Sequence, residues 1–143
     1  MADRKTQKLL DGLQQDLERE LKVVLLYTLQ SCVLLGPRAI NIAPMLRKDA
    51  EAELKHVAFI GDQIVNLGGV PKFSAQKIGE PKDLKTMLEG DLDLEREAIL
   101  EYRERAKQSE LAGEIGLKVR IEEIIAEETD HMRALERILR AWQ

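Results

Sequence analysis

The sequence predicts an all-α protein: an antiparallel four-helix bundle with one long crossover between its second and third helices. Three observations support this fold class. The chain is 44% hydrophobic and 34% charged but only 3% aromatic, a composition typical of long amphipathic helices. Glycine and proline divide it into four long segments, and the connections between those segments differ in length. At 143 residues the chain is expected to form one domain, residues 1–143.

The four predicted helices cover residues 4–35, 38–67, 83–110 and 115–142. Short turns join the first helix to the second and the third to the fourth, so each pair is expected to form an antiparallel hairpin. About 15 residues with little helical pattern separate the two pairs, and fully extended they reach about 50 Å. A 28-residue helix is about 42 Å long. The connection is therefore long enough to run the length of the bundle as a crossover.

A glutamate interrupts the apolar stripe of each predicted helix. In the last helix the stripe advances by steps of four and three, as in a left-handed bundle, and it contains Glu128 and His131. Glu20 and Glu95 take the corresponding positions in the first and third helices, and Glu53 takes it in the second. His56 follows Glu53 by three residues, as His131 follows Glu128.

Four carboxylates in an apolar core are costly, because each loses solvation and each repels the others. Two divalent cations offset that cost, since their four positive charges balance four glutamates beside two neutral histidines. Carboxylate oxygen and imidazole nitrogen suit iron or manganese. A single Glu-x-x-His is weak evidence in a glutamate-rich chain, so buried polar residues without a metal remain the alternative reading.

The stretches around these residues resemble the ferritin-like di-iron carboxylate proteins, and within that group the bacterioferritins. The resemblance extends from about Leu9 to Leu139. It is carried by LERELKVVLLYTLQ around Glu20, AELKHV around Glu53 and His56, MLEGDLDLE ending at Glu95, and IIAEETDH ending at His131.

The resemblance implies a site for two iron ions per subunit, with manganese as an alternative metal. Glu20 and His56 would be terminal ligands of one iron, and Glu95 and His131 would be terminal ligands of the other. Glu53 and Glu128 would bridge the two ions. Tyr27 matches a tyrosine close to the di-iron centre, where it can serve in electron transfer, although a simple core aromatic is the alternative. The implied activity is that of a ferroxidase, which oxidises Fe(II) with O2 or H2O2 for iron storage or detoxification.

Some positions depart from the bacterioferritin pattern. Leu54 stands where bacterioferritins carry the methionine that ligates haem, so haem is not expected. Lys48 and Ala52 replace the residues of an accessory inner-surface iron site. The sequence ends at Gln143 without the fifth helix that lines the four-fold channel of 24-subunit ferritins. A homo-oligomer is still expected, from a dimer to a shell of 12 or 24 subunits.

Composition also limits the other functions. A net charge of −4 and a pI of about 5.3 argue against nucleic acid as the main partner. No apolar run approaches the roughly 18 residues of a membrane span, and the single cysteine, Cys32, fits a reducing cytoplasm. A stand-alone di-iron or di-manganese peroxidase or oxidase, similar to rubrerythrin or manganese catalase, is the alternative enzyme. A non-catalytic helical protein is the remaining alternative.

Overall fold

The computed structural model describes residues 2–74 and 76–142, and these form the predicted all-α bundle. The helices are α1 Arg4–Val33, α2 Pro37–Asn66, α3 Leu84–Leu111 and α4 Ile115–Arg140. Every observed boundary lies within two residues of its predicted position. The described residues contain no β-strand, so the predicted fold class is confirmed.

Residues at the helix ends explain where the helices begin and turn. The Asp3 side chain accepts a hydrogen bond from the backbone N–H of Thr6 (2.8 Å), and Asp83 does the same for Thr86 (3.1 Å). Both are N-caps, which satisfy a backbone donor that the first turn of a helix leaves free. At the turn before α2, Gly36 has a φ of 86°, a left-handed conformation that glycine adopts without steric cost.

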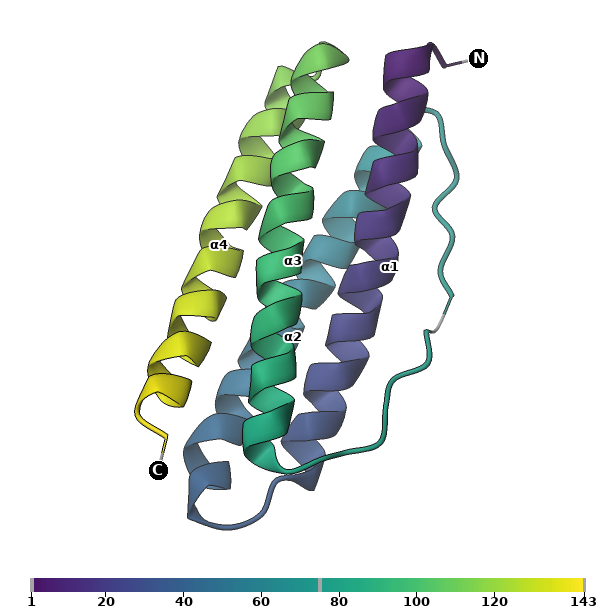
Figure 1. Cartoon of the computed structure of the whole chain (residues 1–143). Helices are drawn as coiled ribbons and strands as arrows, with labels where there is room; N and C mark the ends of the chain where they lie inside the picture. The colour runs from purple at the N-terminus through teal and green to yellow at the C-terminus, as the bar shows by residue number, and fades with distance from the viewer. Residues whose placement is uncertain (1, 75, 143) are drawn as a thin grey trace.

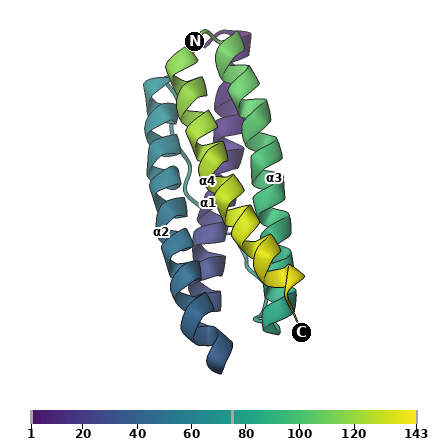
Figure 2. The ribbon, with the colours of Figure 1, turned by 90° about the vertical axis from the view of Figure 1, so that its left-hand side faces the viewer.

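The crossover after α2 runs along the bundle, as its length predicted. Figure 1 shows it descending beside α1 from the end of α2 to the start of α3. The second and third helices are therefore parallel, while α1–α2 and α3–α4 are antiparallel hairpins (Figures 1 and 2). Most contacts between helices lie within these two hairpins, and of the two remaining neighbouring pairs α2 and α4 make fewer contacts than α1 and α3. The seam between α2 and α4 is thus the most open one in the bundle.

The apolar core consists of two clusters with a polar layer between them. One cluster contains Leu13 and Leu17 of α1, and the other contains Val23 and Tyr27 of the same helix. Glu20 lies between these two pairs along α1. The same order holds in α2, α3 and α4, where the glutamate of each stripe separates residues of one cluster from residues of the other. The four helices therefore bring their central glutamates to one level.

A buried ion pair ties α1 to α3 and leads to a stability prediction. Arg105 donates to both carboxylate oxygens of the fully buried Asp16, from Nε at 2.7 Å and from Nη2 at 3.0 Å. A methyl group at Gly12 would collide with the Arg105 guanidinium. We therefore expect Gly12→Ala to displace Arg105 and to lower the free energy of unfolding by about 1–3 kcal/mol.

Urea denaturation of Gly12→Ala beside Gly90→Ala measures this effect. A methyl group at Gly90 meets no atom within 4 Å, so that substitution is expected to stabilise α3 by about 0.5–1 kcal/mol. Equal free energies of unfolding for the two variants would contradict the structural account of Gly12.

Candidate metal centre

The structure brings all six predicted ligand residues together. Two groups of four residues each place ligand atoms within 4.8 Å of one another. The first group is Glu20, Glu53, His56 and Glu128, and the second is Glu53, Glu95, Glu128 and His131. Glu53 and Glu128 belong to both groups, as expected for residues that bridge two metal ions. Metal binding by these six residues stays a prediction.

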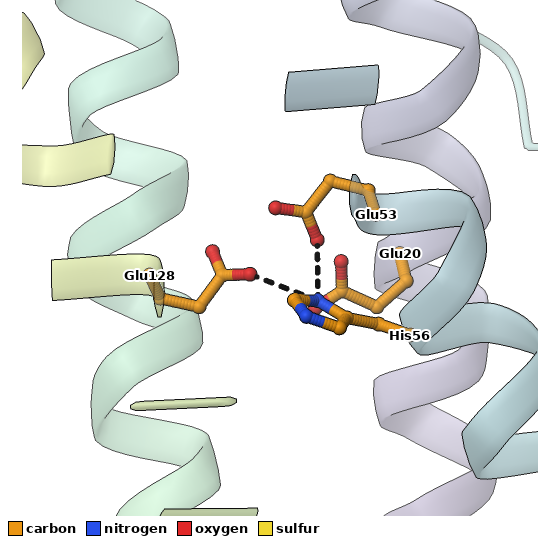
Figure 3. Close-up of side chains that lie close together, drawn as sticks. All are labelled: Glu20, Glu53, His56 and Glu128. Atoms are coloured by element: carbon orange, nitrogen blue, oxygen red, sulfur yellow. Dashed lines mark hydrogen bonds and ion pairs between the residues drawn. The ribbon is translucent and has the colours of Figure 1, made fainter. Parts of the chain in front are cut away.

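Figure 3 shows how the first group converges from three helices. Glu20 comes from α1, Glu128 from α4, and Glu53 and His56 from α2. His56 Nδ1 lies 3.2 Å from Glu53 Oε2 and 3.1 Å from Glu128 Oε1. The four glutamates of the whole site are at most 2% exposed, so their carboxylates face one another in a nearly dry interior.

The second group repeats this arrangement around His131. His131 Nδ1 lies 3.3 Å from Glu53 Oε1 and 3.7 Å from Glu95 Oε1. In both histidines, therefore, Nδ1 is the ring nitrogen that faces the buried glutamates of the site. An ion at either position would meet one Nδ1 and three carboxylates.

A buried tyrosine holds each of the two unshared glutamates. The hydroxyl of Tyr27 donates to Glu95 Oε1, and the hydroxyl of Tyr102 donates to Glu20 Oε1, both at 2.6 Å. Burial raises the pKa of each tyrosine well above its usual value, so both remain donors at neutral pH. Tyr27 was a predicted member of the site, and its role in electron transfer stays a prediction. Tyr102 lies on the apolar stripe of α3 but was not predicted to take part.

The pKa values of Glu53, Glu128 and Glu95 are shifted in different directions. Burial raises the pKa of Glu53, and the neighbouring Glu20 carboxylate raises it further. It also raises the pKa of Glu128. For Glu95 burial acts in the same direction, but the neighbouring Glu128, His131 and Tyr27 side chains outweigh it, and the pKa of Glu95 is lowered. Without a metal, the shared glutamates therefore tend to keep a proton.

The pKa values of both histidines are raised, so each holds a positive charge more readily. Burial lowers the pKa of His131, but Glu95 and Asp49 outweigh it and raise that pKa to about 9. For His56 burial is likewise outweighed, first by Glu128, and the pKa is raised. Without a metal, protons on the histidines and on the shared glutamates therefore offset the negative charge that bound cations would otherwise neutralise.

Several buried ligand atoms of the site are unsatisfied, and this makes the residues suited to divalent cations. Among the described residues, Glu53 Oε1, Glu95 Oε2, Glu128 Oε1 and His131 Nδ1 take part in no hydrogen bond. A buried polar atom without a partner costs about 1–3 kcal/mol. Carboxylate oxygens and imidazole nitrogens are ligands for iron, manganese and zinc, so bound cations would satisfy the unpaired atoms.

Two more carboxylates touch the site that the helical pattern did not predict. Glu127 Oε2 lies 2.7 Å from His56 Nε2, although Glu127 falls off the apolar stripe of α4. Asp49 Oδ1 lies 3.4 Å from His131 Nε2. Leu54, the residue at the haem-methionine position, is 54% exposed, and the described Cys32 is a free, exposed cysteine.

Asp91, one turn before Glu95, gives a second stability prediction. Its Oδ1 accepts a hydrogen bond from Gln30 Nε2 at 2.8 Å, but Asp91 Oδ2 and Gln30 Oε1 have no partner. Burial raises the Asp91 pKa to about 7. Because this pKa is raised in the folded state, the associated stability is present below about pH 4 and is lost as the pH rises to 7.

Asp91→Asn is therefore expected to stabilise the metal-free protein at pH 8, by roughly 2–4 kcal/mol. The Asn amide carries no charge and can donate to Gln30. Thermal unfolding at pH 4 and pH 8 tests this, with Asp93→Asn on the exposed face of α3 as the control. A gain of equal size at both pH values would show that the ionisation of Asp91 is not its cause.

The fold and the site together define a four-helix carboxylate bundle with a candidate binuclear metal centre. The family model for the ferritin-like domain matches residues 10–143, so the chain belongs to the ferritin-like family.

Solved structures agree with this assignment. A ferritin-like di-iron carboxylate protein from Bacillus anthracis is similar at 28% identity and a TM-score of 0.93, covering 96% of this chain and 99% of its own. The bacterioferritin of Desulfovibrio desulfuricans is 24% identical, with a TM-score of 0.86 and coverage of 97% and 83%. An archaeal Dps homologue from Halobacterium salinarum is 19% identical, with a TM-score of 0.91 and coverage of 100% and 85%. The last two likenesses show the fold alone.

One comparison found no match, and the helices themselves were also compared with the requirements of a membrane span. No curated protein matches this sequence. Within the described residues, none of the helices has a stretch apolar enough, over sufficient length, to span a membrane.

Proposed function

We propose that the protein is a bacterioferritin-like ferroxidase that binds two Fe(II) ions and oxidises them with O2 or H2O2. The observation that carries the proposal is the sharing of Glu53 and Glu128 between two buried groups of ligand residues. Shared carboxylates hold two cations about 3.5–4 Å apart, a spacing at which both ions can act on one oxidant. Glu20 and His56 would complete one position, and Glu95 and His131 the other.

With H2O2, two Fe(II), one H2O2 and two protons give two Fe(III) and two waters. With O2, two Fe(II), one O2 and two protons give two Fe(III) and one H2O2. The chain's own residues would orient the ligands and exclude water. Tyr27 and Tyr102 donate hydrogen bonds to the Glu95 and Glu20 carboxylates, and the proposal gives Tyr27 the further role of passing an electron to the site.

The proposal includes a homo-oligomer in the cytoplasm. Large apolar side chains are exposed on the described surface, including Leu35 at 91% and Leu54, and another copy of the chain could cover them. Haem is no part of the proposal, because a leucine side chain has no atom that ligates iron. Sedimentation velocity separates a dimer from a shell of 12 or 24 subunits.

One observation favours a second candidate, a di-iron or di-manganese peroxidase or oxidase that stores no iron. A surface pocket of about 390 Å³ between α2 and α4 is lined by His56, Ile124 and Glu127, among others. That volume falls in the range of pockets for small organic molecules. A reducing co-substrate could therefore approach the His56 side of the site.

Stopped-flow oxidation of Fe(II) added in steps tests the proposed function. We expect a fast phase that saturates at two Fe(II) per chain, in O2 or in H2O2. If additional Fe(II) is then consumed and stays in solution as a protein-bound mineral, storage is supported. Catalytic loss of H2O2 without net consumption of Fe(II) would instead support the peroxidase. Oxidation no faster than in buffer would overturn the ferroxidase.

A further inference from the structure

The two histidines of the site each have a second ring nitrogen, and each of these meets a carboxylate from the opposite helix. His56 is on α2, and its Nε2 lies 2.7 Å from Oε2 of Glu127 on α4. His131 is on α4, and its Nε2 lies 3.4 Å from Oδ1 of Asp49 on α2. Two reciprocal contacts across the site thus connect α2 and α4, neighbouring helices that otherwise meet little.

We propose that Glu127 and Asp49 are positioning residues, which hold His56 and His131 with Nε2–H outward and Nδ1 toward the metal positions. The inference rests on the proposed binuclear centre. A neutral imidazole carries one N–H, and a carboxylate on one nitrogen selects the tautomer that leaves a lone pair on the other. Here the other nitrogen is Nδ1, which faces Glu53 in both histidines, Glu128 in His56 and Glu95 in His131. Carboxylates in such outer positions also raise the basicity of the ligand.

The two contacts differ in their surroundings. The Glu127 side chain is 55% exposed and lines the 390 Å³ pocket, whereas the Asp49 side chain is 13% exposed. Glu127 therefore holds His56 from the solvent side, and its short contact can be removed without opening a cavity in the core. This makes Glu127 the better residue for the test, because its variants are expected to fold normally.

Competition titration with Zn(II), a redox-silent cation, measures the effect on metal affinity. The wild-type chain is expected to bind two Zn(II) tightly. We expect Glu127→Leu to weaken one of the two by about 10–100-fold and to leave the other unchanged. Glu127→Gln keeps an oxygen that can accept the Nε2–H, so it should restore most of the lost affinity. Asp49→Leu should weaken one Zn(II), and the Asp49→Leu, Glu127→Leu double variant should weaken both.

Glu123→Leu is the matched control. Glu123 lines the same pocket one turn before Glu127 and pairs with Arg120 at 3.3 Å, but within the described part of the chain no hydrogen bond or ion pair joins it to His56. Its replacement removes the same charge from the same surface, so it separates a general electrostatic effect from the hydrogen bond. A second readout is the Nε2–H resonance of His56 in the Zn(II)-loaded protein. It should exchange slowly with water in wild type and in Glu127→Gln, and rapidly in Glu127→Leu.

The Zn(II) titrations separate the positioning role of Glu127 from the existence of the binuclear centre. If wild type binds two Zn(II) and Glu127→Leu binds both equally well, the positioning role is wrong while the binuclear centre stands. If Glu127→Gln or Glu123→Leu loses as much affinity as Glu127→Leu, the charge matters rather than the hydrogen bond, and the positioning role is again overturned. A wild-type chain without two tight Zn(II) ions overturns the centre and the inference together.

Discussion

Replacement of Glu128 by leucine is expected to slow Fe(II) oxidation by at least about 100-fold and to make the metal-free protein more stable. Glu128 belongs to both groups of ligand residues, so its loss impairs both metal positions at once. Outer residues of metal sites already cost 10–100-fold when mutated, and a shared ligand should cost at least as much.

The same substitution is expected to raise the free energy of unfolding without metal by about 1–4 kcal/mol. Glu128 is 1% exposed, its pKa is raised by burial, and its Oε1 makes no hydrogen bond among the described residues, only the 3.1 Å contact with His56 Nδ1. An apolar side chain of similar size removes that cost. Activity and stability therefore move in opposite directions, as expected for a residue retained for chemistry.

Two further variants make this test specific. Glu128→Gln keeps the size and polarity of the side chain but not its charge, so it should also lose the fast oxidation and gain less stability. Glu122→Gln, on the exposed side of α4, should change neither. If Glu128→Leu oxidised iron as fast as wild type, Glu128 would not be a ligand. If it destabilised the metal-free protein, the site would be a structural polar network.

The stability of the metal-free protein is expected to fall as the pH rises from 5 to 9, whereas the stabilisation by Mn(II) grows. The pKa values of Glu53 and Glu128 are raised in the folded state, so their contribution is present at low pH and is lost above about pH 4.5. The pKa values of His56 and His131 are raised too. Both contributions are complete below about pH 6.5 and are lost at higher pH, that of His131 as the pH approaches 9.

Glu95 has the opposite sign, because its pKa is lowered. Its contribution is lost as the pH falls below about 4.5, so it does not offset the decline between pH 5 and 9. Metal binding requires deprotonated ligands and therefore strengthens with pH. At a Mn(II) concentration of 100 times Kd, each occupied position adds about 2.7 kcal/mol.

Urea denaturation at pH 5, 7 and 9, with and without Mn(II), measures both trends. Glu128→Leu provides the control: its metal-free stability should decline less steeply with pH, and Mn(II) should add little. Metal-free stability that stays constant or rises from pH 5 to 9 would show that the site does not carry the assigned protons. A Mn(II) increment independent of pH would show that the cation binds elsewhere.

The sequence was sufficient for the fold because the information lies along single helices. The stripe of α4 contains Leu117, Ile121, Ile124 and Leu135, and all four are buried. A glutamate at the same depth in every stripe then predicts a shared polar layer. The spacing is less exact in α1, where steps of three and four residues from Glu20 also reach Leu10 and Val24, whereas the buried neighbours are Leu9 and Val23. An error of one residue changes which side chains flank the apolar face of the helix, but the helix still has an apolar face.

The remaining parts of the site depend on distances between helices, which periodicity does not contain. Glu127 is off its stripe and half exposed, yet its carboxylate reaches His56 on the neighbouring helix α2. Asp49 and Tyr102 contact the site from neighbouring helices. The Asp16–Arg105 pair was missed for the same reason, since each charge is tolerated only because the other helix supplies its partner.

The central claim is that two metal ions lie between Glu53 and Glu128, and anomalous X-ray diffraction tests it most directly. Crystals loaded anaerobically with Fe(II) would be measured above and below the iron absorption edge. We predict two peaks about 3.5–4 Å apart, one beside His56 Nδ1 and one beside His131 Nδ1. A layer without anomalous signal, in crystals that carry iron only at surface carboxylates, would contradict the account.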